Sequence, residues 1–258
     1  MSFTQILLTN ISVVAGAVFV LWMISLRLKD VSIVDIFWGI GFVIIAWVTT
    51  FVVRPTSPRS LFIAVLVTIW GLRLAGYLAW RNIGKPEDYR YRAMREKRGD
   101  RFPLISLFLV FGLQGLIMLI VSLPIQAAAF NTSQLNWLDG IGGAIWLTGF
   151  FFETVGDIQL ARFKANADNQ GKVMDRGLWR YTRHPNYFGD FLVWWGIFVI
   201  ALSGGSAWWT IISPLLMSIL LMRISGVTLL ESSLRNNKQG YEDYVRRTSA
   251  FFPMPPKN

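Results

Sequence analysis

The chain has no cysteine and a single histidine, and only 16% of its 258 residues are charged. Without cysteine there can be no disulfide, no thiol nucleophile and no Cys-ligated zinc or iron–sulfur centre. One histidine argues against a protein-bound haem or a His-rich metal site, so we expect no metal centre. An average soluble domain is about 25% charged. The shortage of charge, together with a hydrophobic content of 53%, therefore predicts a protein that lies largely in lipid.

Long apolar runs account for this composition. A helix needs about 20 mostly apolar residues to cross the hydrocarbon core of a bilayer. Seven such windows predict an all-α integral membrane protein with about seven transmembrane helices, and we expect a single membrane domain over residues 1–258. The windows are Gln5 to Leu26, Ile33 to Val53, Leu61 to Trp80, Phe102 to Phe130, Leu138 to Phe163, Tyr187 to Leu202 and Trp208 to Leu230.

The net charge of +10 is concentrated in two connecting segments and the tail. The segment from Arg81 to Arg101 has eight Lys or Arg residues, and the segment from Lys164 to Arg183 has five. The positive-inside rule places both segments in the cytoplasm, with the N-terminus outside and the C-terminus cytoplasmic. Arg54 and Arg59 run against this assignment, because they lie in the second connection, which it places outside. Because the basic residues form no independent domain, we expect contact with membrane lipids and not with nucleic acid.

Two ionisable side chains, Asp35 and Arg73, lie inside the second and third predicted helices. Charged groups are costly in a membrane and usually face the bundle interior, where they mark function. An isolated Asp35 in apolar surroundings would stay protonated and could donate a proton, whereas a nearby Arg73 would hold it ionised in a structural pair. Both interpretations stay open. Tyr77, one turn beyond Arg73, is either a second proton donor or an ordinary aromatic core residue.

Two acids lie near the end of the fifth predicted helix. Glu153 and Asp157 are four residues apart, which places their carboxylates on one helix face, and Lys164 follows. These acids either pair with basic residues at the water interface or bind a cationic or hydroxyl-rich partner.

The most informative segment is Gly177–Asp190, which reads GLWRYTRHPNYFGD. Pro185 predicts the start of a helix, whose free N–H groups can bind a phosphate or a carboxylate. Guanidinium groups bind phosphate oxygens bidentately, and aromatic faces stack on rings. The basic and aromatic side chains around this point are Arg180, Arg183, His184, Trp179, Tyr181 and Tyr187. On composition alone, the segment can equally be a basic aromatic loop that contacts anionic lipid.

The core Arg183-His184-Pro185-Asn186-Tyr187 resembles the signature of the steroid 5α-reductase-like family of membrane enzymes, in particular its bacterial branch of unknown-function proteins. Sterol C14-reductases and isoprenylcysteine carboxyl methyltransferases are related families with a similar C-terminal half. Further matches span nearly the whole chain: Val34-Asp35 with Trp38-Gly39, Trp70-Gly71 with Arg73-Leu74, Arg90-Tyr91, Asp157 followed by Lys164, and Tyr241 to Tyr244 before Thr248 and Phe251-Phe252-Pro253.

This resemblance implies an enzyme of the bacterial inner membrane whose active site faces the cytoplasm. It would use NADPH to reduce the carbon–carbon double bond of an enone lipid, such as a 3-oxo-Δ4 steroid, with the cofactor site at about residues 150–258. The cofactor positions that it implies are Asp157, Lys164, Tyr181, His184, Asn186, Tyr187 and Asp190, joined by Arg81, Arg90, Tyr91, Glu231 and Arg235. The eukaryotic steroid enzymes hold the ketone oxygen with a Gln-Glu pair, which is missing here. Asp35 is the nearest acidic substitute, so the substrate stays open.

Two other functions compete with this one. A methyltransferase that uses S-adenosylmethionine and acts on a lipidic acceptor shares the Arg-His-Pro-Asn-Tyr core. NADPH carries three phosphates and S-adenosylmethionine carries none, so the number of guanidinium groups favours NADPH. The second alternative is a non-catalytic membrane protein that binds sterol or anionic lipid through its basic loops.

Overall fold

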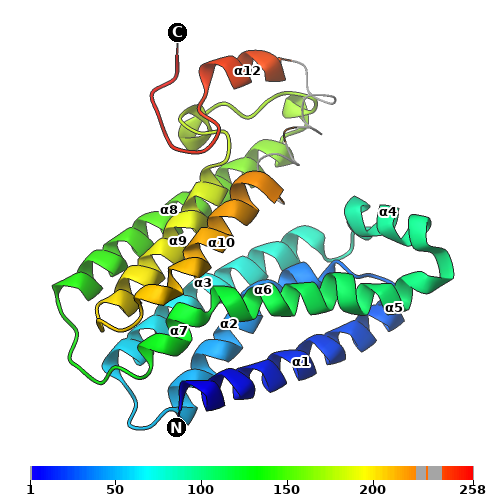
Figure 1. The fold of residues 1–258 in the computed structure, drawn as a ribbon. Coiled ribbons are helices and arrows are strands. Elements are labelled where there is room, and N and C mark those ends of the chain that lie inside the picture. The colour runs from blue at the N-terminus through cyan, green and yellow to red at the C-terminus, as the bar shows by residue number, and fades with distance from the viewer. Residues whose placement is uncertain (1, 225–230, 232–239, 258) are drawn as a thin grey trace. The chain divides into compact units, whose positions relative to one another are not determined.

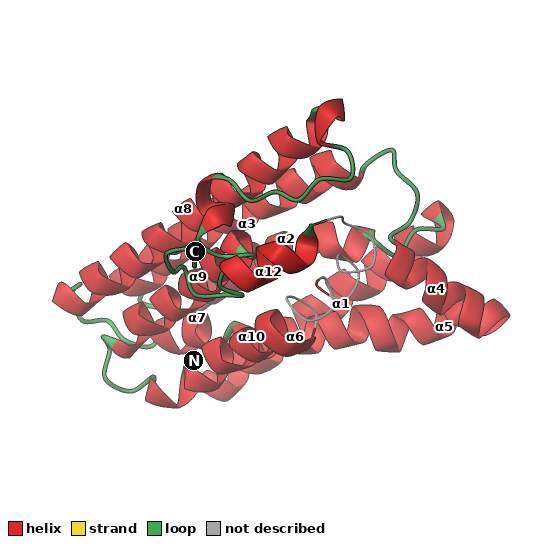
Figure 2. Ribbon diagram, turned by 90° about the horizontal axis from the view of Figure 1, so that it is seen from above, coloured by secondary structure: helices red, strands yellow, loops and turns green. Residues whose placement is uncertain are grey.

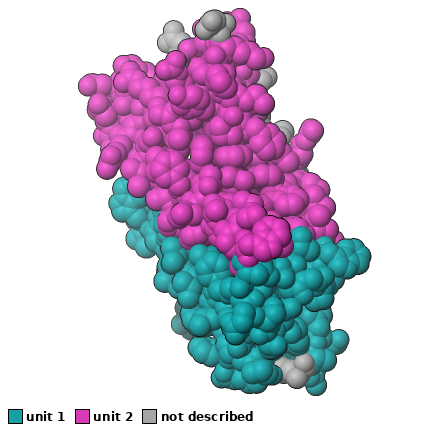
Figure 3. All heavy atoms as spheres, turned by 90° about the vertical axis from the view of Figure 1, so that its left-hand side faces the viewer, with its two compact units in different colours: residues 1–136, 201–210 teal, residues 137–200, 211–258 magenta. Residues whose placement is uncertain are grey.

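The structure is a computed structural model that describes residues 2–224, 231 and 240–257. All regular secondary structure in these residues is helical, as Figures 1 and 2 show, which confirms the predicted all-α class. The chain divides into two compact units, coloured separately in Figure 3. Unit 1 comprises Met1–Asn136 and Ala201–Thr210, and unit 2 comprises Trp137–Ile200 and Ile211–Asn258.

Unit 1 consists of helices with short connections. α1 starts behind a capping box, in which Ser2 Oγ accepts the backbone N–H of Gln5 at 3.2 Å and the Gln5 side chain accepts the backbone N–H of Ser2 at 2.8 Å. The helices are α1 (Phe3–Leu28), α2 (Ile33–Val52), α3 (Pro58–Asn82), α4 (Tyr89–Arg98), α5 (Phe102–Ser106), α6 (Leu113–Val121) and α7 (Leu123–Ala128), with the short 3₁₀ turn η1 (Gly99–Arg101) before α5 and the π-helical turn η2 (Leu107–Gly112) after it.

A pair of glycines lets α2 and α3 approach closely. Gly39 and Gly71 are both buried, and a Cβ atom added to Gly71 would lie 2.5 Å from the carbonyl oxygen of Gly39. Small residues of this kind allow helix backbones to come together in a membrane, where no hydrophobic effect drives helices to associate. Asp35 lies in the first turn of α2, about one turn before Gly39.

Arg59 is one of the two cations that ran against the predicted topology, and it is fully buried in unit 1. Its guanidinium donates to Asn131 Oδ1 at 2.7 Å and to the carbonyl of Gln134 at 3.2 Å. The neighbouring Ser57 hydroxyl donates to the carbonyl of Asn131. Arg59 therefore joins the start of α3 to the segment of residues 131–134 inside unit 1, and it is not a solvent-exposed loop charge.

Unit 2 contains two long helices and the tail. α8 is followed by the short 3₁₀ turns η3 and η4, and α9 begins at Pro185, as predicted. The elements are α8 (Trp137–Ala165), η3 (Ala167–Asn169), η4 (Gly177–Arg180), α9 (Pro185–Leu202, of which the last two residues belong to unit 1), α10 (Ile212–Ile219), the π-helical turn η6 (Leu220–Ile224) and α12 (Tyr241–Arg247). The 3₁₀ turn η5 (Trp208–Ile211) precedes α10.

Glycines at seven-residue spacing form a seam between α8 and α9. A Cβ at Gly142 would lie 2.8 Å from the carbonyl oxygen of Gly196, and a Cβ at Gly149 would lie 2.5 Å from that of Gly189. At the end of the seam, a Cβ at Gly156 would lie 3.2 Å from the backbone nitrogen of Asn186. We refer to these five glycines as the α8–α9 seam. It brings the end of α8 against the start of α9, where the polar site of unit 2 lies.

Five helical stretches of the described chain are long and apolar enough to cross a membrane. They are Phe3–Leu28, Ile33–Val52, Pro58–Asn82, Tyr89–Val121 and Pro185–Leu202. The predicted span from Leu138 to Phe163 lies within α8, and the predicted span from Trp208 to Leu230 coincides in part with a shorter apolar helix, Trp208–Ile224. Its remaining residues, 225–230, lie outside the described part. The apolar helices support a membrane protein, while the count of seven and the orientation of the termini stay predictions.

Candidate functional site

The polar residues of unit 2 gather where α8 ends and α9 begins. Asn186 Nδ2 donates to Asp157 Oδ1 at 3.1 Å, which links the first turn of α9 to α8. Asp157 is 5% exposed and Asn186 is half-buried. The structure thus brings together two residues that the sequence predicted as cofactor-binding, from positions 29 residues apart. Their contact depends on the α8–α9 seam, since Gly156 is the residue next to Asp157.

A glycine also shapes the loop before this helix. Gly177 has a φ of 59°, and a Cβ there would collide with the side chain of Gln159. The same Gln159 accepts the backbone N–H of Leu178 at 3.0 Å. Trp179, the next residue, is buried and its indole N–H donates to the carbonyl of Gly156 at 3.1 Å. Trp179 therefore supports the loop against α8.

Arg183 is held inside unit 2. Only 8% of it is exposed, and its Nε donates to Glu231 Oε1 at 2.8 Å. Its Nη1 donates to two carbonyls at the end of α12, those of Val245 at 3.1 Å and Thr248 at 2.5 Å. These bonds make Arg183 a connection between the motif and the tail, and they leave little of the guanidinium for a phosphate.

The backbone beside Arg183 pairs with the tail as well. Arg183 N–H donates to the carbonyl of Ser249 at 2.9 Å, and the Thr182 hydroxyl donates to the carbonyl of Phe251 at 2.7 Å. In return, Met254 N–H donates to the carbonyl of Tyr181 at 2.9 Å. We call residues 244–254 the docked tail. The sequence indicated that the basic, aromatic tail belongs to the site, but it gave no signal for these backbone bonds.

His184 and Glu231 form a hydrogen-bonded pair. His184 Nε2 lies 3.2 Å from Glu231 Oε1, the oxygen that also accepts from Arg183. Burial lowers the pKa of His184 below its ordinary 6.5, and the attraction of Glu231 only partly opposes this effect. Burial disfavours ionised Glu231, but hydrogen bonds from His184 and Arg183 outweigh burial and bring its pKa to about 2. Since an ionised carboxylate only accepts hydrogen bonds, Nε2 of a neutral His184 carries the proton and Nδ1 is an acceptor.

The other predicted residues of unit 2 differ in exposure. Lys164 and Arg180 are exposed, and Tyr181 is 44% exposed. Tyr187 stacks on His184, with ring centroids 5.5 Å apart and planes within 4°. Asp190 is half-buried on α9. Arg235 lies outside the described residues.

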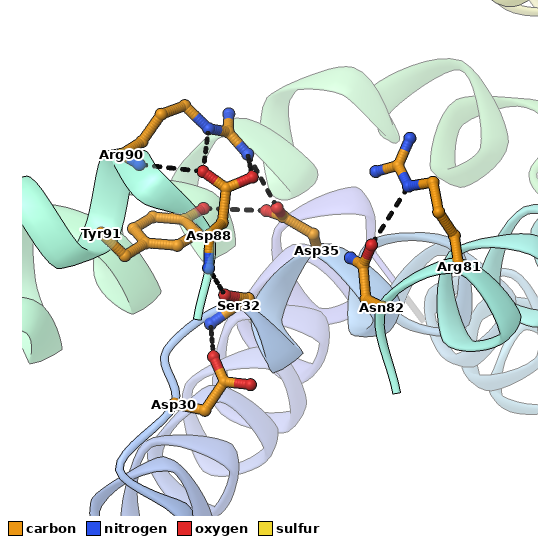
Figure 4. A network of polar contacts seen from close by, with 8 residues as sticks. All are labelled: Asp30, Ser32, Asp35, Arg81, Asn82, Asp88, Arg90 and Tyr91. Atoms are coloured by element: carbon orange, nitrogen blue, oxygen red, sulfur yellow. Dashed lines mark hydrogen bonds and ion pairs between the residues drawn. The ribbon is translucent and has the colours of Figure 1, made fainter. Parts of the chain in front are cut away.

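A second polar cluster lies in unit 1, at the start of α2 and α4 (Figure 4). Asp35 Oδ2 accepts from Arg90 Nη2 at 3.0 Å, and Asp35 Oδ1 accepts from the Tyr91 hydroxyl at 2.8 Å. Arg90 Nε also donates to Asp88 Oδ1 at 2.9 Å. The structure therefore unites Asp35, predicted as catalytic, with Arg90 and Tyr91, predicted as cofactor-binding. The ion pair of Asp35 is with Arg90 of α4, whereas the sequence had suggested Arg73 as its partner.

Hydrogen bonds also tie the α1–α2 turn to the α3–α4 loop. Asp88 N–H donates to Ser32 Oγ at 2.8 Å, and Ser32 N–H donates to Asp30 Oδ1 at 2.8 Å (Figure 4). Val31 N–H donates to Glu87 Oε1 at 2.9 Å. Burial acts against ionised Glu87 and Asp88, but hydrogen bonds from Arg95 to the first and from Arg90 to the second hold both pKa values below their ordinary ones. Asp88 could have been recognised as the N-cap of a basic helix, because Asp is a preferred N-cap residue.

The remaining candidates of unit 1 lie on α3. Tyr77 is half-buried, and the guanidinium of Arg81 lies 5.8 Å from its ring centroid. Arg81 is exposed and donates to Asn82 Oδ1 at 3.1 Å. Arg73 is half-buried. Of these three residues, Figure 4 draws Arg81, whose marked hydrogen bond is to Asn82.

Comparison with known proteins gives a family and a relative. Residues 21–248 match a family model described as "Protein of unknown function (DUF1295)". An uncharacterized protein of Schizosaccharomyces pombe, C594.04c, is 26% identical over 276 aligned residues, which cover 91% of this chain and 76% of the relative. The match to the family model includes both polar clusters and the Arg-His-Pro-Asn-Tyr motif. The chain therefore belongs to the DUF1295 family of proteins of unknown function.

Proposed function

We propose that this protein is a membrane-bound oxidoreductase that uses NADPH to reduce the carbon–carbon double bond of an enone lipid. The observation that carries the proposal is the hydrogen bond between Asp157 of α8 and Asn186 at the start of α9, beside a loop rich in arginine and aromatic residues. The resemblance of that loop to the steroid 5α-reductase-like signature supplies the reaction. The family itself has no established function, so the substrate class and the cofactor both rest on this proposal.

The donor set in unit 2 fits a phosphorylated dinucleotide. Exposed Lys164 and Arg180 can bind phosphate oxygens, and the start of α9 adds backbone N–H groups. An Asp–Asn pair can accept from and donate to ribose hydroxyls. Tyr181, with 44% of its surface exposed, can stack on a ring. When bound, NADPH would supply a hydride to the substrate.

The two buried side chains of the motif, Arg183 and His184, have a structural role in the site. Arg183 fixes the loop to the docked tail and to Glu231, and neutral His184 presents an acceptor nitrogen. A neutral imidazole cannot neutralise a phosphate, so we assign phosphate binding to Lys164 and Arg180. His184 is suited to accept a hydrogen bond from an amide or amine group of the ligand.

Asp35 is one of the two candidate proton donors in unit 1. Asp35 accepts two hydrogen bonds, one of them within an ion pair with Arg90. The ion pair joins the start of α2 to the start of α4, which gives Asp35 a structural role beside its candidate role as an acid. Tyr77 stays the second candidate proton donor to the ketone oxygen of the substrate.

Ligand titration of the purified full-length protein tests the proposal. We expect NADPH to bind more tightly than NADH or S-adenosylmethionine, because only NADPH carries the additional 2′-phosphate. Asp157→Asn should weaken NADPH binding at least ten-fold, the cost of about 1.4 kcal/mol that follows from losing one charge-assisted hydrogen bond. Asp168→Asn is the matched control, since Asp168 is an exposed acid in the connection that follows α8.

The outcomes separate the alternatives. Tighter binding of S-adenosylmethionine would replace the reductase by the methyltransferase. A protein that binds neither NADPH nor NADH would refute the assigned site. An Asp157→Asn variant that binds NADPH as well as the wild type does would also refute it. Oxidation of bound NADPH in the presence of an enone lipid then tests the reaction itself.

A further inference from the structure

A cavity of about 230 Å³ lies in unit 1, between the end of α1 and the start of α5. Its walls combine the apolar side chains of Leu26, Val31, Phe102 and Pro103 with two basic residues, Lys29 and Arg95. Pockets for drug-sized ligands measure roughly 300–1,000 Å³. This cavity can therefore take only part of a larger amphiphile or a small polar group.

Arg95 forms a fixed part of the wall. Its Nε and Nη2 donate to the two carboxylate oxygens of Glu87 at 3.0 and 2.7 Å, and Nη2 also donates to the carbonyl of Lys29 at 3.3 Å. Its guanidinium lies 4.5 Å from the ring centroid of Phe102. Because Glu87 compensates its charge, Arg95 organises the cavity and adds little net charge to it.

Lys29 supplies the charge that is not compensated in this way. It caps α1 with a φ of 55°, its side chain is exposed, and no ion pair joins its amino group to another described residue. An exposed lysine beside an apolar cavity is complementary to a ligand that joins an anion to an apolar body. A free phosphate has no apolar part that could contact the four apolar side chains of the cavity.

The position of the cavity along the chain indicates which ligand that is. α1 is apolar enough to cross a membrane and ends at Leu28, one residue before Lys29. Leu26, Leu28 and Leu104 near the cavity in sequence are 38%, 59% and 62% exposed, as side chains that face lipid are. The change from apolar to basic sequence marks the level of the lipid headgroups.

We propose that this cavity binds the glycerol-phosphate end of an anionic phospholipid. Lys29 contacts the headgroup phosphate, Leu26, Val31 and Phe102 contact the glycerol and the first methylenes, and the acyl chains stay in the bilayer. This site uses none of the residues assigned to NADPH, so a test of the lipid site is independent of a test of the proposed reductase.

Lipid binding by the full-length protein tests the site, with native mass spectrometry of protein exchanged into neutral detergent. Phosphatidylglycerol, phosphatidylcholine and glycerol 3-phosphate are the probes. We expect phosphatidylglycerol to bind best, and Lys29→Asn to weaken its binding roughly five-fold, which is the contribution of one basic residue near an anionic surface. Asparagine tolerates the left-handed backbone of this position, so the substitution removes the charge without adding strain. Lys97→Asn is the matched control, because Lys97 is exposed on α4 and does not line the cavity.

Equal loss in the Lys29→Asn and Lys97→Asn variants would overturn the proposal in favour of unspecific attraction to the basic surface. Binding of glycerol 3-phosphate as tight as that of phosphatidylglycerol would overturn it in favour of a small-anion site. An unchanged preference for phosphatidylglycerol in Lys29→Asn would overturn it outright. Selective loss in Lys29→Asn alone supports it.

Discussion

His184 is the single imidazole of the chain, and its pH behaviour can be read without interference from other histidines. Burial lowers its pKa below 6.5, whereas the unfolded chain has the ordinary value. As the pH falls through 6.5, the unfolded chain therefore takes up a proton first, and the free energy of unfolding decreases. NMR titration of ring-labelled protein should give one imidazole resonance with an apparent pKa below 6.5.

The variant Glu231→Gln provides the control for this titration. Glu231 raises the pKa of His184 against the effect of burial, so removing its charge should lower that pKa further. A pKa at or above 6.5 in the wild type, or an upward shift in Glu231→Gln, would contradict the arrangement of these two side chains.

Arg183 illustrates which features of the site the residue types alone predict and which they do not. The motif correctly indicated a basic side chain beside the start of α9, and the family resemblance named Glu231 as part of the same site. The sequence offers no signal for the partners of Arg183 in the tail, since the carbonyls of Val245 and Thr248 are 62 and 65 residues away. Any backbone carbonyl can accept a hydrogen bond, so only the tertiary structure distinguishes a structural arginine from one that binds an anion.

At the level of helices, the α8–α9 seam makes a sharp prediction about single glycines. In Gly149→Ala the new Cβ would lie 2.5 Å from the carbonyl oxygen of Gly189 and 2.7 Å from the backbone nitrogen of Val193, and neither backbone atom can rotate away. We expect a loss of about 1–3 kcal/mol in stability, as for other overpacked positions. Thermal unfolding followed by circular dichroism measures it.

Gly140 on the same helix is the matched control. A Cβ at this position meets nothing within 4 Å, so Gly140→Ala should be neutral or stabilise α8 by up to about 1 kcal/mol through helix propensity. If the two substitutions gave equal melting temperatures, close backbone packing at Gly149 would be excluded.

Helix positions were predicted better than helix interruptions. The starts of α2 and α9 follow from Ile33 and Pro185, where apolar sequence and a helix-starting proline coincide. In contrast, the predicted span from Phe102 to Phe130 is divided into α5, η2, α6 and α7. Pro124 in the first turn of α7 gives a local reason for the last break. The π-helical turn at Leu107–Gly112 depends on packing, which hydropathy does not report.

At the scale of the whole molecule, the lack of cysteine allows the topology to be measured directly. A single cysteine introduced into the chain is its only thiol. Thr132→Cys should react with a membrane-impermeant maleimide in intact cells, because an outside N-terminus and seven spans place the connection between the fourth and fifth predicted helices outside. Lys97→Cys and Asp168→Cys should react only after the membrane is permeabilised. All three positions are exposed.

Reversal of this labelling pattern would contradict the positive-inside assignment while leaving the fold unchanged. The sequence predicts membrane insertion through local composition, which is a sum over neighbouring residues. It does not predict that Asp35 meets Arg90 and Tyr91, because that contact depends on how the α3–α4 loop is tied to Ser32 and Val31. Contacts between distant segments are the part of the site that sequence reasoning could not supply.

The docked tail has a consequence for how unit 2 folds. The hydrogen bond from Thr182 to Phe251 closes a loop of 69 residues, and the bond from Tyr244 to the carbonyl of Trp179 closes one of 65. Helical turns form from neighbours in sequence, whereas such long closures cost chain entropy before any contact is gained. We therefore expect the segment from Trp179 to Arg183, which carries these bonds, to reach its final contacts after α8 and α9 have formed. A ligand that binds at this segment would add binding free energy that offsets the entropy cost of the closure.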